Sequence, residues 1–395
     1  MPLIFAVIAA ALVVALTANG VNVSPDSSAY LQAAADVSRV GGVPLDYSWW
    51  PPLYPLTLAL FADAQTATQW LNAACYALSV MLTLYALESR LHQGAGIAIL
   101  GAALILSPAL QYVHQWAWSE PAFIALVTAW FALLLTDVRK HVVLFALATA
   151  LACLQRYSGV LLIPLGVFAL VLYRVHWKRI AVYVVIAGVP LALWMLRNVA
   201  LGYPASGAER GIAALTWDRG GWFTVNTLLS WWFPLTLAGI VGARYRVRLP
   251  LPFTVTAGYY VIAHIGMTIY SGTVTYINNP DNRLLAPVFI PLVYLALVTG
   301  GKLRCRALNV RISCSSIPLV TTCNPPNAAH QRRFYFRRRY APTGCVRLAL
   351  ANHHPIVSSL PGIWRADERR RLRHGDVDGL HARSAGHSSH AQHQR

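Results

Sequence analysis

Long apolar stretches without a charged residue alternate with short polar segments along residues 1–300. A helix needs about 20 mostly apolar residues to span a membrane, within a range of about 17–25. The apolar stretches predict ten spans, which lie within Pro2–Pro25, Ala64–Leu87, Gln93–Ser119, Pro121–Thr136, Val142–Gln155, Ser158–Tyr173, Ile180–Leu196, Gly220–Ala243, Leu249–Pro280 and Leu284–Gly301. The shortest, Val142–Gln155, is also compatible with a buried or re-entrant segment. The predicted fold is an all-α polytopic membrane protein.

The segment between the first two predicted spans is too long for a simple turn and predicts a helix of its own. Ser24 suits the N-cap, Pro25 the first helical position and Asp26 the first turn. The sequence DSSAYLQAAADV that starts at Asp26 is compatible with a helix. Further on, the proline-rich segment Trp49–Pro55 predicts a rigid, aromatic interfacial loop rather than the interior of a helix.

The net charge of +18 is distributed unevenly along the chain. Residues 1–300 carry 15 Lys and Arg against 10 Asp and Glu, whereas residues 301–395 carry 17 against 4. The apolar pattern stops after Gly301, so the chain divides into a transmembrane domain, 1–301, and a basic tail, 302–395, for which the composition predicts disorder.

A basic tail suits anionic lipid headgroups or non-specific nucleic acid, and no specific nucleic-acid partner is predicted. We favour a third explanation, the hypothesis that the tail results from a change of reading frame. Sequence rich in Arg, His, Ser and Pro is a common out-of-frame product of GC-rich genes. The hypothesis fails if no other frame of the gene encodes further apolar spans after codon 300.

The basic clusters RKH, RVHWKR and RYRVR all fall in inside loops if the N-terminus is cytoplasmic. Most ionisable residues near the spans then lie at the outer face, and such residues are functional candidates. Because transporters usually place coupling groups near the midplane, this distribution favours an active site at the outer surface. His264, near the middle of the ninth predicted span, supports the alternative of a lipid or sugar transporter or flippase.

Two acids are the main candidates for catalysis. Asp26 is the first carboxylate after the first span, and it suits either a helix N-terminus or a general base that deprotonates an attacking hydroxyl. Tyr30 follows four residues later on the same helix face and is a candidate for substrate binding. Glu120, in the sequence WAWSEPAF, is either a helix-start acid or a group that orients a sugar or holds a divalent cation.

Three outer arginines are candidates for phosphate recognition, because a guanidinium offers paired donors to phosphate. They are Arg156 in LQRYSG, Arg197 in WMLRN and Arg283 in NNPDNRLLAP, and Tyr157, which follows Arg156, is a candidate for substrate binding with it. Snorkelling of these side chains to the interface is the structural alternative. The sequence has neither a Walker loop nor a strand-associated GxGxxG, so any glycosyl donor is expected to be lipid-linked. Fixed arginines would stabilise the charge on a leaving polyprenyl phosphate.

In chain order, Asp26 with SSAYLQAA, PPLYPLTLAL, SEPAF, QRYSG, WMLRN and DNRLLAP resemble the membrane glycosyltransferases of the C superfamily. The nearest branch contains the dolichyl-phosphate-mannose-protein mannosyltransferase-like and lipopolysaccharide-core sugar transferases. The resemblance implies an inverting transferase of the bacterial inner membrane with its active site facing the periplasm. Its donor would be a polyprenyl-phosphate sugar, and its acceptor a lipid, polysaccharide or protein of the cell envelope.

Within that resemblance, Asp26 matches the acid of the first outer loop, Glu120 the acid of the SEP motif and Arg283 an arginine near the final spans. Many relatives carry two adjacent acids in the first loop, whereas Ser27 follows Asp26 here. Relatives commonly continue with more spans or an outer domain. An inactive, truncated transferase is therefore a further alternative.

Overall fold

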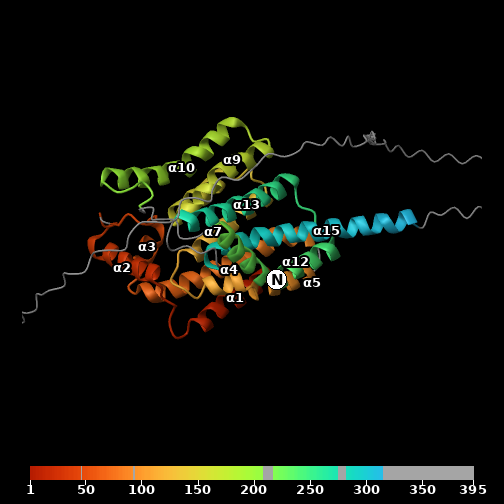
Figure 1. The fold of residues 1–395 in the computed structure, drawn as a ribbon, viewed down its shortest axis with the longest axis horizontal. Coiled ribbons are helices and arrows are strands. Elements are labelled where there is room, and N and C mark those ends of the chain that lie inside the picture. The colour runs from red at the N-terminus through yellow and green to blue at the C-terminus, as the bar shows by residue number, and fades with distance from the viewer. Residues whose placement is uncertain (46, 92–93, 208–216, 275–281, 315–395) are drawn as a thin grey trace, which may run out of the picture. The chain divides into compact units, whose positions relative to one another are not determined.

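The computed structural model describes residues 1–45, 47–91, 94–207, 217–274 and 282–314, which form helices and no β-strand (Figure 1). The first helices are α1 (Pro2–Leu16), α2 (Pro25–Val40), α3 (Leu53–Leu58), α4 (Ala64–Leu91), α5 (Gly94–Ile105), α6 (Pro108–Val113), α7 (Glu120–Leu135) and α8 (Val142–Gln155). They are followed by η1 (Tyr157–Leu161), α9 (Leu162–Leu172), α10 (Trp177–Ala200), α11 (Trp217–Ser230), α12 (Trp232–Tyr245), α13 (Leu251–Val274), α14 (Asn282–Leu285), η2 (Ala286–Val288) and α15 (Phe289–Cys314).

The helices pack as one bundle whose neighbours come from distant parts of the chain (Figure 1). Helix α4 packs against α1 and α7, and α8 packs against α7 and α10. Helix α15 packs against α12 and α13. In the centre, the buried ring of Phe131 contacts the rings of Trp130, Phe253 and Tyr260. This aromatic core holds α7 against the C-terminal helices.

Glycines allow a close contact between α12 and α15. A Cβ atom on Gly242 would collide with the backbone carbonyl of Leu297, and one on Gly300 with the carbonyl of Gly239. Small residues allow this approach, and membrane helices commonly associate through such contacts.

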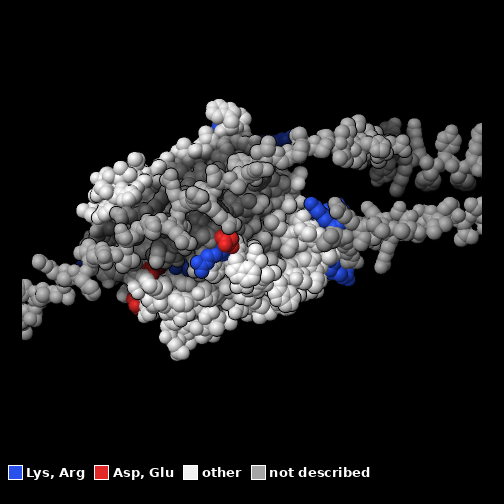
Figure 2. Space-filling model, in the orientation of Figure 1, with Lys and Arg blue, Asp and Glu red and all other residues white. Residues whose placement is uncertain are grey.

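The outer surface of the bundle is largely apolar. Leu193 and Leu196 of α10 are 61% and 64% exposed, and Ile262 of α13 is 70% exposed. Most of the described surface in Figure 2 is uncharged. Apolar area of this extent is costly in water and suits the lipid of a bilayer, so the chain is an integral membrane protein.

The structure confirms the all-α polytopic fold, but it does not confirm ten spans. Among the described residues, three helices are long and apolar enough to cross a membrane: Ala64–Leu91, Trp177–Ala200 and Asn282–Lys302. Helices α11 and α12 form a fourth candidate as a pair bent by 58°. Five shorter apolar helices, including Val142–Gln155, account for further predicted spans.

Two breaks inside charge-free stretches explain part of this difference. Gln93–Ser119 was predicted as one span, but α5 ends at Ile105 and Ser107 caps α6, with its Oγ accepting from the amide of Leu110. Pro108 fits the first position of that new helix. Gly220–Ala243 is likewise divided between α11 and α12, on either side of Trp231.

The predicted helix after the first span is confirmed as α2. Its N-cap is Ser24, whose Oγ accepts from the amide of Ser27 at 3.3 Å. The predicted loop Trp49–Pro55 is correct only in its first part, because α3 begins at Leu53 and contains Pro55. A proline in the first turn of a helix replaces an amide that has no partner within the helix, so it does not break α3.

Helix α15 continues beyond the predicted boundary at Gly301 to Cys314. The prediction of disorder for the rest of the tail falls on residues 315–395, outside the described residues.

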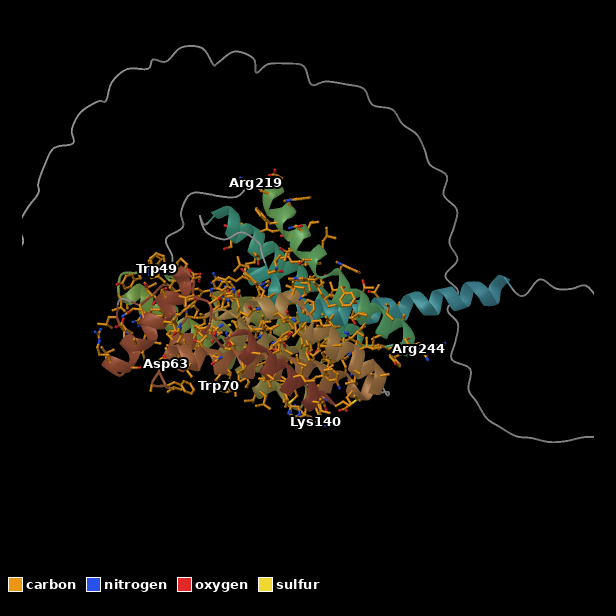
Figure 3. All side chains as sticks on the ribbon, turned by 90° about the horizontal axis from the view of Figure 1, so that it is seen from below. Trp49, Asp63, Trp70, Lys140, Arg219 and Arg244 are labelled. Carbon is orange, nitrogen blue, oxygen red and sulfur yellow. The ribbon has the colours of Figure 1, made fainter. Side chains whose placement is uncertain are left out.

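The predicted inside loops meet one another. Arg90 donates to the carbonyls of Leu135 and Arg248, and Arg179 donates to the carbonyl of Arg139. Trp49 and Asp63, from the predicted outer segments, lie at one end of the bundle, away from Lys140 and Arg244 (Figure 3). The fold thus separates the two sets of loops that the charge pattern distinguishes.

Candidate active site

A backbone bridge brings the start of α2 next to the start of α7. The amide of Asn22 donates to the carbonyl of Gln115 at 2.8 Å, and the amide of Ala117 donates to the carbonyl of Asn22 at 2.9 Å. Asn72 of α4 fixes the same loop by donating to the carbonyls of His114 and Trp116. The two predicted acids are therefore held at neighbouring helix N-termini.

Side chains strengthen this junction. The indole Nε1 of Trp118 donates to Ser24 Oγ at 2.8 Å, so the N-cap of α2 is tied to the residue two positions before Glu120. Asp26 lies in the first turn of α2 and Glu120 is the first residue of α7. The positive end of each helix dipole favours the ionised carboxylate.

Two arginines connect these carboxylates. Arg283 of α14 places Nη2 2.7 Å from Asp26 Oδ2 and Nε 2.6 Å from Glu120 Oε1. Arg156, between α8 and η1, places Nη1 2.6 Å from the same Glu120 oxygen. Two carboxylates and two guanidinium groups form one continuous ion-pair network from four separate elements.

Burial differs sharply across the network. The Glu120 side chain is 1% exposed, Arg283 17%, Arg156 19% and Asp26 30%. Glu120 Oε1 receives both arginine contacts, while Oε2 is buried and has no hydrogen-bond partner among the described residues. Asp26 is the more accessible acid, and Glu120 is the one that holds the arginines.

Packing on an aromatic ring and two tethers position Arg283. Its guanidinium carbon lies 4.4 Å from the centre of the Trp118 ring, a cation–π arrangement. The preceding residue, Asn282, accepts a hydrogen bond from Trp231 Nε1 at 2.8 Å. The carbonyl of the following residue, Leu284, lies 3.0 Å from His264 Nε2. Contacts on both sides thus fix the short helix that carries Arg283.

Ser119 joins Tyr30 to the network. Its Oγ accepts from Arg156 Nη1 at 2.9 Å and lies 3.3 Å from the Tyr30 hydroxyl. Gln155 Nε2 donates to the Ser119 carbonyl. Burial raises the pKa of Tyr30 to about 12, so the phenol remains protonated at physiological pH.

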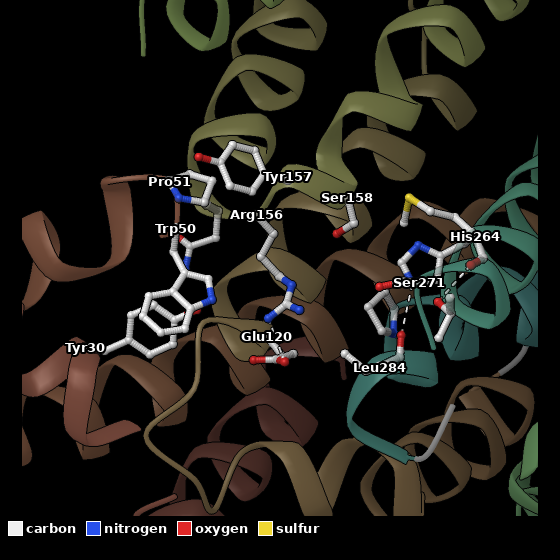
Figure 4. A pocket seen from close by; sticks show the side chains of 14 residues that line it. Tyr30, Trp50, Pro51, Glu120, Arg156, Tyr157, Ser158, His264, Ser271 and Leu284 are labelled. Atoms are coloured by element: carbon white, nitrogen blue, oxygen red, sulfur yellow. Dashed lines mark hydrogen bonds and ion pairs between the residues drawn. The ribbon is translucent and has the colours of Figure 1, made fainter. Parts of the chain in front are cut away.

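The network opens onto a pocket of about 250 Å³ (Figure 4). Its lining comes from α2, the loop before α3, the start of α7, the end of α8, η1, α13, α14 and η2: Tyr30, Trp50, Pro51, Glu120, Gln155, Arg156, Tyr157, Ser158, His264, Met267, Thr268, Ser271, Leu284 and Pro287. Glu120 and Arg156 lie between Tyr30 and Trp50 on one side and His264 on the other (Figure 4). Two predicted groups, Asp26 and Arg283, join the network without lining this pocket.

Arg197 is the predicted phosphate ligand that the structure places elsewhere. Its guanidinium donates to the carbonyls of Pro44 and Tyr47 at 2.7 and 2.9 Å and lies 4.6 Å from the Trp194 ring centre. Its neighbour Asn198 donates to the carbonyl of Ser48. Arg197 therefore fastens the loop before α3 to α10.

Six of the seven predicted site residues thus come together, and several pocket residues were not predicted. Ser158, Met267 and Thr268 occupy apolar stretches in which nothing distinguishes them from core residues. His264, whose place in the ninth predicted span supported a transporter, lies in the wall of the same pocket. His264 faces α14 because of tertiary packing, and no pattern in the sequence predicts this contact.

A divalent cation was a further expectation at Glu120. Among the described residues, no three His, Cys, Asp or Glu side chains are grouped so that they could hold a metal ion. The carboxylates of Asp26 and Glu120 already face guanidinium groups, so a cation there would have to displace Arg283. These residues do not fit a metal site as they are arranged.

Comparisons with known proteins identify the class of fold. No protein-family model matches the chain, and a search of curated proteins finds no match. Among solved structures the chain is similar to ArnT from Cupriavidus metallidurans bound to undecaprenyl phosphate, with a TM-score of 0.58 and 17% sequence identity. The match covers 81% of this chain and 65% of that one, so the chain spans less than two thirds of that protein. The chain therefore shares the fold of that structure.

Proposed function

We propose that the protein is an inverting glycosyltransferase that moves a sugar from a polyprenyl-phosphate donor to a hydroxyl acceptor. The observation that carries this proposal is the ion-pair network of Asp26, Glu120, Arg156 and Arg283 beside a pocket at the outer end of an apolar bundle. A likeness to a structure that holds undecaprenyl phosphate supports the choice of donor.

Asp26 is the general base in this proposal. It is the more exposed of the two acids, and it uses one carboxylate oxygen for Arg283. A positioned carboxylate of this kind can accept the proton of an acceptor hydroxyl as that oxygen attacks the anomeric carbon. Glu120 is almost fully buried and acts by positioning both arginines.

Arg283 and Arg156 stabilise the leaving group. Phosphate resembles a carboxylate in accepting paired hydrogen bonds from a guanidinium, so a donor phosphate competes with Asp26 for Arg283. Negative charge grows on the phosphate as the bond to the sugar breaks. Fixed cations that face this charge stabilise the transition state more than the ground state.

The reaction is a single displacement. The acceptor oxygen forms a bond to the anomeric carbon while the bond between that carbon and the phosphate oxygen breaks, which inverts the configuration. The proton moves to Asp26 and the electron pair of the broken bond remains on polyprenyl phosphate. The products are the glycosylated acceptor and the polyprenyl phosphate.

We place this site on the periplasmic side of the bacterial inner membrane. The basic clusters of the predicted inside loops support this orientation, because cytoplasmic loops carry an excess of Lys and Arg. The acceptor would then be a lipid, polysaccharide or protein of the cell envelope.

The decisive experiment compares Asp26→Asn with the wild-type protein in membranes supplied with a radiolabelled polyprenyl-phosphate sugar. We expect transfer to fall by about 10²–10⁴-fold, the range of general base catalysis. Binding of undecaprenyl phosphate should remain, because Arg156 and Arg283 are unchanged.

Asp137→Asn is the matched control, since Asp137 also forms an ion pair, with Lys140 at 3.1 Å, but lies beyond the opposite end of α7. It should transfer at the wild-type rate. Retained transfer in a well-folded Asp26→Asn protein would remove Asp26 as the base. If the wild-type protein neither binds nor uses any polyprenyl-phosphate sugar, the proposed function is wrong.

A further inference from the structure

The pocket has two parts with different chemistry. In one part the guanidinium of Arg156 faces the carboxylate of Glu120. On the side of His264, that residue and Ser158 supply neutral polar groups (Figure 4), and Thr268 is hydrogen-bonded to the His264 carbonyl. Met267, Leu284 and Pro287 also line the pocket and add apolar atoms to its wall.

The tautomer of His264 follows from its hydrogen bond. Nε2 lies 3.0 Å from the carbonyl oxygen of Leu284, which can only accept, so Nε2 carries the proton and donates. In the neutral ring Nδ1 is then an acceptor. Nδ1 is buried and has no hydrogen-bond partner among the described residues.

Ser158 provides a second unused group in the same wall. Its Oγ is buried and also lacks a hydrogen-bond partner in the described part of the chain. In Figure 4 the Ser158 side chain is directed into the space between Arg156 and His264. Thr268 donates to the His264 carbonyl at 2.8 Å, which leaves its oxygen able to accept a further bond.

Buried polar groups without partners are unusual, because each one gives up its hydrogen bonds to water and gains nothing in return. Together with Glu120 Oε2, Ser158 Oγ and His264 Nδ1 make three such groups in the wall of one pocket, and the two neutral ones indicate a ligand that supplies their partners. A hydroxyl or amino group can donate to His264 Nδ1, and a hydroxyl can pair with Ser158. Phosphate has no proton to offer Nδ1 when fully ionised, and it suits the arginines.

We propose that Ser158 and His264 form the subsite for the sugar ring of the donor, and that they select for its hydroxyl or amino groups. This inference rests on the proposed function, since it assigns the two parts of one pocket to two parts of one molecule. The phosphate of the donor lies by the arginines and the sugar lies between Arg156 and His264.

A structural role for His264 alone, as the tether of α14, is the competing explanation. The variant His264→Gln separates the two roles. The amide of glutamine can replace the Nε2 donor to Leu284, but it offers no acceptor in the place of Nδ1. Ser158→Ala removes the second group without changing the tether.

The chain contains closely matched controls. His114 and Ser79 are also buried, each with one polar atom that has no partner among the residues that the structure describes, and neither lines the pocket. His114 Nδ1 lies 2.6 Å from the carbonyl of Leu110. His114→Asn can keep that contact while it removes the unpaired nitrogen, and Ser79→Ala removes an unpaired hydroxyl.

The test measures dissociation constants of the full chain in lipid nanodiscs. The ligands are undecaprenyl phosphate and its glucosyl, galactosyl and amino-sugar derivatives. We expect the wild-type protein to bind at least one sugar derivative more tightly than undecaprenyl phosphate. His264→Gln and Ser158→Ala should each weaken that derivative by about fivefold to tenfold, the equivalent of one hydrogen bond, and leave undecaprenyl phosphate within twofold.

Equal weakening of both kinds of ligand in His264→Gln would assign His264 to the tether and overturn the subsite. Unchanged binding of every ligand in both variants would also overturn it, as would equal losses in His114→Asn and Ser79→Ala. If the wild-type protein binds undecaprenyl phosphate but prefers none of its sugar derivatives, the subsite is wrong while the phosphate site stands. Failure of the wild-type protein to bind any of these lipids contradicts the proposed function itself.

Discussion

Arg283 Nη2 lies 2.7 Å from Asp26 Oδ2, although the two residues come from opposite ends of the described chain. Asp26 belongs to the first helix after α1, and Arg283 to the short helix before α15. The same arginine reaches Glu120 at 2.6 Å. The ion-pair network therefore forms only when the first and last parts of the bundle are packed together.

Arg283→Ala should lower the transfer rate by about 10²–10³-fold, because one fixed donor that faces a developing negative charge contributes about that much. Arg283→Lys should give an intermediate rate, since lysine keeps the charge and loses the forked geometry. Initial rates in membranes with a polyprenyl-phosphate sugar measure both variants.

Arg39→Ala serves as the control for these variants, because Arg39 is 77% exposed and pairs with Asp36 on the surface of α2. It should transfer at the wild-type rate. An Arg283→Ala protein that keeps both its fold and full activity would exclude Arg283 from leaving-group stabilisation.

Glu120→Gln should destabilise the fold more than a substitution that breaks an ion pair on the surface. Loss of the carboxylate removes the ionic partner of Arg156 and leaves Arg283 paired with Asp26 alone, and removal of one partner of a buried ion pair costs about 3–5 kcal/mol. Thermal unfolding in detergent measures the change. Asp137→Asn, which breaks an exposed pair with Lys140, should leave the midpoint unchanged. Equal midpoints for Glu120→Gln and the wild type would show that the network does not stabilise the bundle.

The sequence was sufficient for features that depend on local chemistry. Ser24, Pro25 and Asp26 marked the start of α2, because capping is decided within a few residues. The positions of Glu120, Arg156 and Arg283 next to apolar spans identified them as candidates, because charge at such places is costly. No local rule could pair Arg283 with Asp26, since their contact depends on how helices far apart in sequence pack.

Other features needed the three-dimensional packing. Arg197 and Arg156 are both single arginines beside aromatic residues in predicted outer turns. In the structure, Arg156 pairs with Glu120 in the wall of the pocket, whereas Arg197 donates to the carbonyls of Pro44 and Tyr47. A charge-free stretch likewise does not show where its helix breaks, as at Ser107 and Trp231, because hydropathy does not depend on helix direction.

Arg197→Ala therefore tests a distinction that the sequence left open. We expect faster proteolysis near residues 44–48, because the variant loses the donors that bind this loop to α10. Affinity for undecaprenyl phosphate should stay within about twofold of the wild-type value, a difference below 0.5 kcal/mol. Arg156→Ala, measured in parallel, should lose affinity for undecaprenyl phosphate and show no faster proteolysis near residues 44–48. If Arg197→Ala loses affinity for the lipid as strongly as Arg156→Ala, Arg197 contacts the phosphate after all.

Gly242→Leu should weaken the contact between α12 and α15. The new side chain would meet the backbone of Leu297, which cannot move aside as a flexible side chain can. Overpacking of this kind typically costs about 1–3 kcal/mol and should lower the thermal midpoint. Gly258→Leu on α13 is the control, because a Cβ at Gly258 meets nothing within 4 Å. Equal midpoints for the two variants would show that α12 and α15 tolerate separation.

Tyr30 predicts a specific loss of stability at alkaline pH. Burial raises its pKa from 10.0 to about 12 in the folded protein, so between these values the unfolded chain releases a proton that the folded chain retains. Stability must then fall as pH rises, by about 1.4 kcal/mol per pH unit for one such group. The contribution is fully present below pH 10 and is lost as the pH passes through the pKa of Tyr30 in the folded protein.

The variant Tyr30→Phe tests this, because it lacks the phenol that titrates. Its unfolding free energy, measured by chemical denaturation, should fall less steeply with pH in this window, by the amount that corresponds to one proton. Tyr85→Phe, which changes an exposed tyrosine on α4, should keep the wild-type slope. Identical slopes for Tyr30→Phe and the wild type would mean that the phenol of Tyr30 is accessible to solvent.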